Sequence, residues 1–227
     1  MPEAVVFDLD GTVLKVNSFR LWVSYLIKAR IPHLRRRGRW RLSLGVARAL
    51  MARKAGVISH ETLKWRLQQL WQGVAEGDGG AIEADFVGVL KRFVRPELSD
   101  VMRAVAAGEI DAILATAAAG DYAYGLGCAL GFRHIVATPR IREKGDPSTV
   151  GIFKREAVCR LLAELGWQER DIVLLTDHAD DLPLIGISRD VYWFGPEEAR
   201  TALQRDLPDV RLRPGLQADE ILLTQSA

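Results

Sequence analysis

The apolar residues of this chain change their spacing twice along the sequence. A short run, Ala4 to Phe7, stops at a carboxylate, which is typical of a buried parallel strand that reaches the edge of its sheet. From about Phe19 to Phe93 the apolar residues recur at helical spacing instead, with Ser59 as a predicted N-cap and Pro96 after the last helix. The two clearest helical faces are Leu63, Leu67, Leu70, Trp71 and Val74, and Ile82, Phe86, Val89, Leu90 and Phe93. We therefore predict one strand followed by a block of amphipathic helices.

One helix of this block has an unusually wide apolar surface. Its apolar residues at helical spacing are Trp40, Leu44, Ala47 and Met51, with Leu42, Val46 and Leu50 beside them. We expect the tryptophans of the block to lie in its core rather than to form a stacking platform for bases. These tryptophans are Trp22, Trp40, Trp65 and Trp71.

After Pro96 the pattern alternates between helices and strands. Helices are predicted over Leu98 to Ala106, over Asp121 to Leu130, and through Val158, Leu161, Leu162 and Leu165 up to Gly166. Strands are predicted over Ala112 to Ala115, Ile135 to Ala137 and Ile172 to Leu175, and near Val191 to Phe194. This alternation predicts an α/β fold with a right-handed parallel sheet, whose active site lies at the carboxyl ends of the strands. We assign residues 1–16 and 95–227 to the α/β core and residues 17–94 to the inserted helices.

Composition narrows the class of protein. The chain has 227 residues, of which 48% are hydrophobic and 26% charged, so it is neither disordered nor collagen-like. Its apolar stretches are much shorter than the ~20 residues that span a bilayer, and no basic region precedes an apolar one at the amino terminus. We therefore expect a cytoplasmic protein. Cys128 and Cys159 show no metal-site or disulfide spacing, so we expect both to be buried packing residues.

Charge is distributed very unevenly along the chain. Twelve of the 31 Lys and Arg lie in residues 11–60, which contain no Asp or Glu, and the remainder has 19 basic residues against 29 acidic ones, a formal charge of −10. A basic field attracts anions, whereas the acidic remainder is compatible with cation binding. The run Arg35-Arg36-Arg37 indicates either a solvated basic face or an anion-binding surface.

Three predicted strands end in polar residues. Asp8-Leu9-Asp10-Gly11-Thr12 follows the first strand, Thr116 follows the second in the chain, and Asp177 to Asp181 follow Leu175. Carboxylates that converge from separate strands repel one another unless a cation holds them, and hard oxygen ligands favour Mg²⁺. The pattern therefore predicts a divalent cation at this edge.

The segment Val5-Val6-Phe7-Asp8-Leu9-Asp10-Gly11-Thr12 resembles the first motif, hhhDxDGT, of the haloacid dehalogenase superfamily. The segment from Thr176 to Pro183 resembles the fourth motif, GDxxxDxP, with Thr176 where glycine is common. The chain is most similar to the phosphoserine phosphatase-like branch, which has a helical cap after the first strand. This resemblance implies a Rossmann-like parallel sheet core with an inserted all-helical cap domain.

The resemblance also implies roles for the acidic residues. Asp8 would be the nucleophile that becomes an aspartyl-phosphate, and Asp10 would protonate the leaving oxygen and later activate water. Gly11 would allow the sharp turn, and the Thr12 hydroxyl would orient the loop. The Mg²⁺ site would consist of Asp8, Asp10 through its backbone carbonyl, and Asp177, with Asp181 supporting it.

The remaining motifs are less regular. Thr116 would bind a phosphoryl oxygen, although Thr116-Ala117-Ala118-Ala119 stands where the branch usually has serine followed by glycines. The lysine that neutralises the phosphorylated aspartate is assigned to Lys154, at a helix start, with Lys144 as the competitor in a loop. His178 is interpreted as an ordinary loop histidine, with contact to the substrate or a proton relay as the alternative.

The leading function is a Mg²⁺-dependent phosphatase that acts on a small phosphorylated substrate. Phosphotransfer or phosphomutase activity through the same intermediate remains open as an alternative. A third hypothesis, from another class, is a non-catalytic protein that binds anions or an anionic membrane surface through residues 28–54. We favour membrane contact over nucleic acid as an accessory role for this segment, because its apolar positions recur at helical spacing. The sequence does not determine the oligomeric state.

Overall fold

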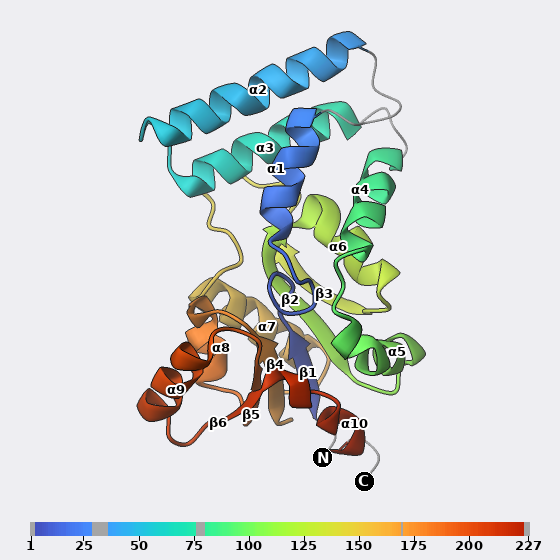
Figure 1. The fold of residues 1–227 in the computed structure, drawn as a ribbon, viewed down its shortest axis with the longest axis vertical. Coiled ribbons are helices and arrows are strands. Elements are labelled where there is room, and N and C mark those ends of the chain that lie inside the picture. Colours follow the sequence, from blue (N-terminus) through green and yellow to red (C-terminus); the bar gives the residue numbers. More distant parts are fainter. Residues whose placement is uncertain (1–2, 29–35, 76–79, 169, 225–227) are drawn as a thin grey trace.

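One parallel sheet organises the part of the chain that the computed structural model describes, which is residues 3–28, 36–75, 80–168 and 170–224. Within these residues, six strands lie in the order β3-β2-β1-β4-β5-β6 (Figure 1). They are β1 (Ala4–Phe7), β2 (Ala112–Ala119), β3 (His134–Thr138), β4 (Ile172–Thr176), β5 (Asp190–Trp193) and β6 (Arg211–Pro214). The strands predicted from apolar runs are confirmed. The sequence analysis missed β6, because this short edge strand carries two arginines and no apolar run.

The sheet is buried on both faces, because alternate residues of each strand point to opposite sides. Val5 and Phe7 of β1 belong to one apolar cluster, whereas Ala4 and Val6 belong to another. The first cluster is covered by α5 (Ser99–Ala107), α6 (Gly120–Ala129) and α10 (Glu220–Thr224), and the second by α7 (Ile152–Glu164), α8 (Leu182–Ile185) and α9 (Glu197–Asp206). The architecture is therefore the predicted α/β type, with helices on both sides of a parallel sheet.

Four helices lie in the chain between β1 and α5 and stack beyond the carboxyl end of β1 (Figure 1). We call them the helical block: α1 (Ser18–Lys28), α2 (Arg36–Lys54), α3 (His60–Ala75) and α4 (Ala81–Lys91). The segments that enter and leave the block pair with each other, since the Lys15 N–H donates to the Phe93 carbonyl and the Arg95 N–H to the Val13 carbonyl, both at 2.9 Å. The domain boundaries at 16/17 and 94/95 stay a prediction. No helix among the described residues is long and apolar enough to cross a membrane.

A cluster of aromatic rings joins the helical block to the sheet layer. Trp22 is fully buried, with its ring centroid 5.8 Å from that of Trp71 on α3 and 5.4 Å from that of Tyr122 on α6. Ser59 also caps α3 as predicted, because its hydroxyl accepts a hydrogen bond from the Thr62 N–H at 3.1 Å. The predicted burial of Trp22 and Trp71 is confirmed.

Some burial predictions are wrong. Trp40 is exposed, because α2 turns Leu42 and Val46 toward the other helices of the block and Trp40 away from them. Cys128 and Cys159 are also exposed, on helices whose buried faces are formed by other residues such as Leu126 and Val158. The Arg35-Arg36-Arg37 run lies outside the described side chains.

The two tryptophans provide a matched test of this packing. Trp22→Ala removes a fully buried ring and should lower the free energy of unfolding by about 3–5 kcal/mol. Trp40→Ala removes a solvent-exposed ring and should change the same quantity by no more than about 0.5 kcal/mol. Urea denaturation of both variants measures the difference, and equal losses for the two would contradict the packing of the helical block.

Candidate active site

The carboxyl edge of the sheet brings the predicted site residues together. Asp8 directly follows β1, and its N–H donates to the Leu175 carbonyl of β4 at 2.9 Å. In the register of the sheet, Phe7 lies opposite both Leu114 and Leu175, so Thr116 in β2 and Asp177, directly after β4, each come two residues beyond these positions. Neighbouring strands therefore carry Thr116, Asp8 and Asp177 to the same edge.

Lys154 lies in the first turn of α7 and is only 2% exposed. Its Nζ donates to Asp8 Oδ1 at 2.6 Å and to Asp181 Oδ2 at 2.9 Å. Burial lowers the pKa of Lys154, but the two carboxylates outweigh it and the net shift is upward. Lys144 lies exposed in the loop before α7. The structure thus places Lys154, rather than Lys144, beside Asp8.

The acidic residues here are held in unequal environments. Burial raises the pKa of Asp8, Lys154 lowers it, and Asp181 and Asp10 raise it further. Burial also raises the pKa of Asp10 to about 6, although hydrogen bonds from Ser18 lower it. The Ser18 N–H, at the start of α1, donates to Asp10 Oδ1 at 2.8 Å. One lysine does not balance these carboxylates, so the edge favours an additional cation.

The residues present fit a Mg²⁺ ion. Gly11 has a φ of +80°, and a Cβ at this position would overlap the Asp177 carboxylate, so glycine lets the turn after Asp10 approach Asp177 closely. Among the described residues, no three His, Cys, Asp or Glu side chains are arranged as a metal cluster. A site here would therefore rest on the carboxylates of Asp8 and Asp177, the Asp10 backbone carbonyl and water, which is a hard oxygen set.

Asp181 and Thr116 already have partners in the protein. The Thr176 hydroxyl donates to Asp181 Oδ2 at 2.6 Å, so the threonine in the usual glycine position orients the carboxylate that binds Lys154. Thr116 is buried within β2, which continues to Ala119, and its Oγ1 accepts the Ala118 N–H at 3.0 Å. Asp181 therefore holds Lys154 in place through their hydrogen bond. Thr116 lies inside β2, near the end of the strand where the site residues meet.

His178 takes part in a local turn. Its Nδ1 accepts the Asp180 N–H at 3.1 Å, and its side chain is largely exposed. This geometry agrees with its interpretation as a loop histidine.

Arg95 is a site residue that the sequence analysis missed. Its Nε–H donates to the Thr12 carbonyl at 2.8 Å, and a second guanidinium N–H donates to the Gly11 carbonyl at 2.7 Å. The Thr12 hydroxyl, expected to orient this loop, is buried without a hydrogen-bond partner among the described residues. Arg95 holds the loop instead. No spacing rule could link Arg95 to Gly11, since the helical block separates them in the chain.

A cavity of about 560 Å³ lies between the helical block and the sheet edge. Asp10, Ala117 and Ala118 line it from the core. The other side of the cavity is lined by Asn17, just before α1, and by residues of the helical block, namely Phe19, Arg20, His60, Glu61 and Lys64. The Lys64 Nζ donates to the Ala117 carbonyl at 3.1 Å and to Ser148 Oγ at 2.8 Å, so α3 lies directly against the end of β2. The cavity can thus hold a small molecule beside Asp10.

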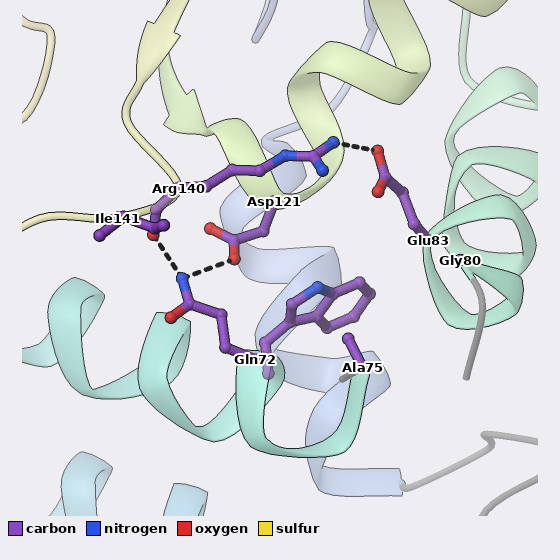
Figure 2. Close-up of a pocket in the computed structure, with 8 residues that line it drawn as sticks. Gln72, Ala75, Gly80, Glu83, Asp121, Arg140 and Ile141 are labelled. Carbon is purple, nitrogen blue, oxygen red and sulfur yellow. Dashed lines mark hydrogen bonds and ion pairs between the residues drawn. The ribbon is translucent and has the colours of Figure 1, made fainter. Parts of the chain in front are cut away.

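The same polar face of α3 binds the core further along the helix. Gln68 Nε2 donates to Asp121 at 2.7 Å, and Gln72 donates to Asp121 and to the Arg140 carbonyl. Figure 2 shows Gln72 and Asp121 beside the ion pair of Arg140 and Glu83, around a second cavity of about 380 Å³. Because these polar groups bond to one another, this region joins the helical block to the core.

Comparisons with known proteins agree with this geometry. The model of the haloacid dehalogenase-like hydrolases matches residues 5–185, which is most of the chain. The chain belongs to this family. Among solved structures, this hydrolase is similar to a protein of unknown function from Bordetella pertussis Tohama I, with 17% identity, coverage of 93% of this chain and 98% of that one, and a TM-score of 0.73.

Two further structures share the fold of this haloacid dehalogenase-like hydrolase. A HAD family hydrolase from Salmonella enterica subsp. enterica serovar Typhi has 13% identity, coverage of 98% and 72% of the two chains, and a TM-score of 0.60. A probable phosphoserine phosphatase from Vibrio cholerae has 14% identity, coverage of 100% and 65%, and a TM-score of 0.62. The search of curated proteins found no match.

The cation site can be tested by calorimetry. Native protein should bind Mg²⁺, and Asp177→Asn should lower its affinity at least about tenfold, because a carboxylate ligand is lost. Asp180→Asn removes the same negative charge from an exposed residue nearby and should leave the affinity for Mg²⁺ unchanged. Equal affinity of native protein and Asp177→Asn would show that Asp177 is not a ligand.

Proposed function

We propose that this haloacid dehalogenase-like hydrolase is a Mg²⁺-dependent phosphatase that hydrolyses a small phosphomonoester through an aspartyl-phosphate at Asp8. The observation that carries the proposal is the unequal pair of carboxylates at the end of β1. The buried ammonium of Lys154 donates to Asp8 and favours its carboxylate form, whereas burial raises the pKa of Asp10 to about 6 and the Ser18 N–H donates to it. One carboxylate is thus placed as a nucleophile and the other for proton transfer near neutral pH.

The first step forms a bond between an Asp8 carboxylate oxygen and phosphorus and breaks the bond between phosphorus and the leaving oxygen. Protonated Asp10 donates its proton to that oxygen, so the alcohol departs neutral. In the second step Asp10, now a carboxylate, accepts a proton from water as the water oxygen attacks phosphorus. The Asp8–phosphorus bond breaks and phosphate leaves. A bound Mg²⁺ would supply positive charge that offsets repulsion between the anionic nucleophile and the phosphate.

The surrounding residues support this sequence of steps. Lys154 lies within hydrogen-bond distance of Asp8 and can neutralise charge that develops on the phosphoryl group. Arg95 holds the carbonyls of Gly11 and Thr12, which fixes the turn that carries Asp10. The helical block lines the cavity beside Asp10, so a substrate bound there would be shielded in part from bulk water. Thr116 is proposed to donate its hydroxyl hydrogen to a phosphoryl oxygen, because Oγ1 only accepts in its hydrogen bond with the Ala118 N–H.

Transfer of the phosphoryl group to an alcohol would use the same residues and stays the alternative. The ratio of free phosphate to alkyl phosphate formed in the presence of added alcohol distinguishes the two reactions.

The nucleophile assignment is tested with a minimal aryl phosphate and Mg²⁺. Asp8→Asn keeps the shape of the side chain but loses its nucleophilic charge, so kcat should fall at least about a thousandfold. Asp10→Asn should bind the substrate but turn over slowly, because the leaving oxygen is not protonated. Hydrolysis by Asp8→Asn at the native rate would rule out Asp8 as the nucleophile.

The role of Lys154 can be separated from a general effect of positive charge. Lys154→Met keeps the length of the side chain and should lower kcat about a hundredfold, because the ammonium beside Asp8 is lost. Lys144→Met removes an exposed charge in the neighbouring loop and should leave kcat unchanged. Thermal unfolding checks that both variants are folded. A larger loss of kcat for Lys144→Met would reverse the assignment.

A further inference from the structure

The outer face of α2 carries an apolar stripe that the fold itself does not bury. Trp40, Leu44 and Met51 are 71%, 44% and 62% exposed. At 100° per residue these three positions fall on one side of the helix, opposite Leu42, Val46 and Ala49, which are buried against the rest of the block. In Figure 1, α2 is the element farthest from the sheet. The stripe therefore faces away from both the core and the cavity at Asp10.

Basic side chains flank this stripe on both sides. At the same helical spacing Arg41 and Arg48 lie along one flank and Lys54 along the other, and all three are exposed. Neither α2 nor any other part of residues 11–60 contains an Asp or Glu. Among the described residues, no ion pair joins Arg41, Arg48 or Lys54 to a carboxylate from elsewhere in the fold. The surface of α2 thus combines exposed apolar side chains with positive charges and no negative ones.

The combination of positive charge and exposed apolar area on α2 favours one kind of binding partner. A second copy of the chain that docked through the same face would bring Arg41, Arg48 and Lys54 of the two copies together without an acidic partner, which is repulsive. A nucleic acid would satisfy the basic residues but would leave the stripe without an apolar counterpart. An anionic bilayer provides both, since its phosphates attract the basic flanks and its acyl boundary accepts Trp, Leu and Met side chains.

We propose that α2 docks on an anionic lipid surface, with Trp40, Leu44 and Met51 at the acyl boundary and Arg41, Arg48 and Lys54 at the phosphates. This role is independent of the reaction at Asp8. Because α2 lies at the far end of the helical block, a docked molecule keeps its cavity and sheet edge outside the bilayer. The helix anchors the protein at the surface and does not cross it.

Sedimentation with vesicles tests the proposal in full-length protein at low salt. Native protein should bind vesicles of three parts phosphatidylcholine to one part phosphatidylglycerol and should not bind phosphatidylcholine alone. The triple variant Arg41→Gln, Arg48→Gln, Lys54→Gln should bind roughly a hundredfold more weakly, since each basic residue contributes about fivefold. A matched variant, Lys91→Gln, Arg160→Gln, Arg205→Gln, makes the same charge change at exposed positions on other helices and should bind nearly as native protein does.

A second triple variant tests the apolar stripe. Trp40→Ser, Leu44→Ser, Met51→Ser keeps every charge and should lose most vesicle binding, while thermal unfolding confirms that the protein is folded. Absence of binding by native protein would overturn the proposal, as would equal binding by the α2 charge variant and its matched control. Native-like binding by the serine variant would also overturn it, because the surface would then recognise only negative charge, as an acidic macromolecule or a nucleic acid presents it.

Discussion

The ammonium group of Lys154, buried between Asp8 and Asp181, is the interaction on which the site depends. It ties the first turn of α7 to the end of β1 and to the turn after β4. A buried lysine is stable as a cation only where carboxylates compensate for the loss of water, and removal of one partner from such a group leaves an uncompensated charge. Thr176 adds a hydroxyl donor to Asp181. The charged group therefore fixes Asp8, Asp181 and the lysine in one arrangement.

The loop that follows Asp8 is bound by both ends of the helical block. The first helix begins at Ser18, whose N–H binds the Asp10 carboxylate, and the return segment carries Arg95, which binds the Gly11 and Thr12 carbonyls. A shift of the block would therefore act on the loop that carries Asp10. The block is held over the cavity both by the polar contacts of α3 with the core, from Lys64 to Gln72, and by the buried aromatic contacts of Trp22 with Trp71 and Tyr122.

Much of this could be predicted from the sequence, for physical reasons. Ala4 to Phe7 and Ile172 to Leu175 are buried on both faces, so they read as apolar runs that end at carboxylates. By contrast, β6 is an edge strand with arginines and gives no such signal. The periodicity of α2 shows two apolar faces but not which one is buried, so the prediction that Trp40 lies in the core is wrong. Arg95 binds backbone carbonyls more than eighty residues earlier in the chain. Since every residue has a backbone carbonyl, no side-chain pattern in the sequence could identify these partners.

The central claim is that Asp8 carries the phosphoryl group during turnover. The most direct test mixes native protein, Mg²⁺ and a phosphomonoester labelled in its phosphoryl group, stops the reaction with acid before the first turnover is complete, and maps the label on peptides. The account predicts a labelled peptide with the acid-stable, base-labile phosphate of an acyl phosphate at Asp8. Release of phosphate with Mg²⁺ while no label ever appears at Asp8 would contradict it.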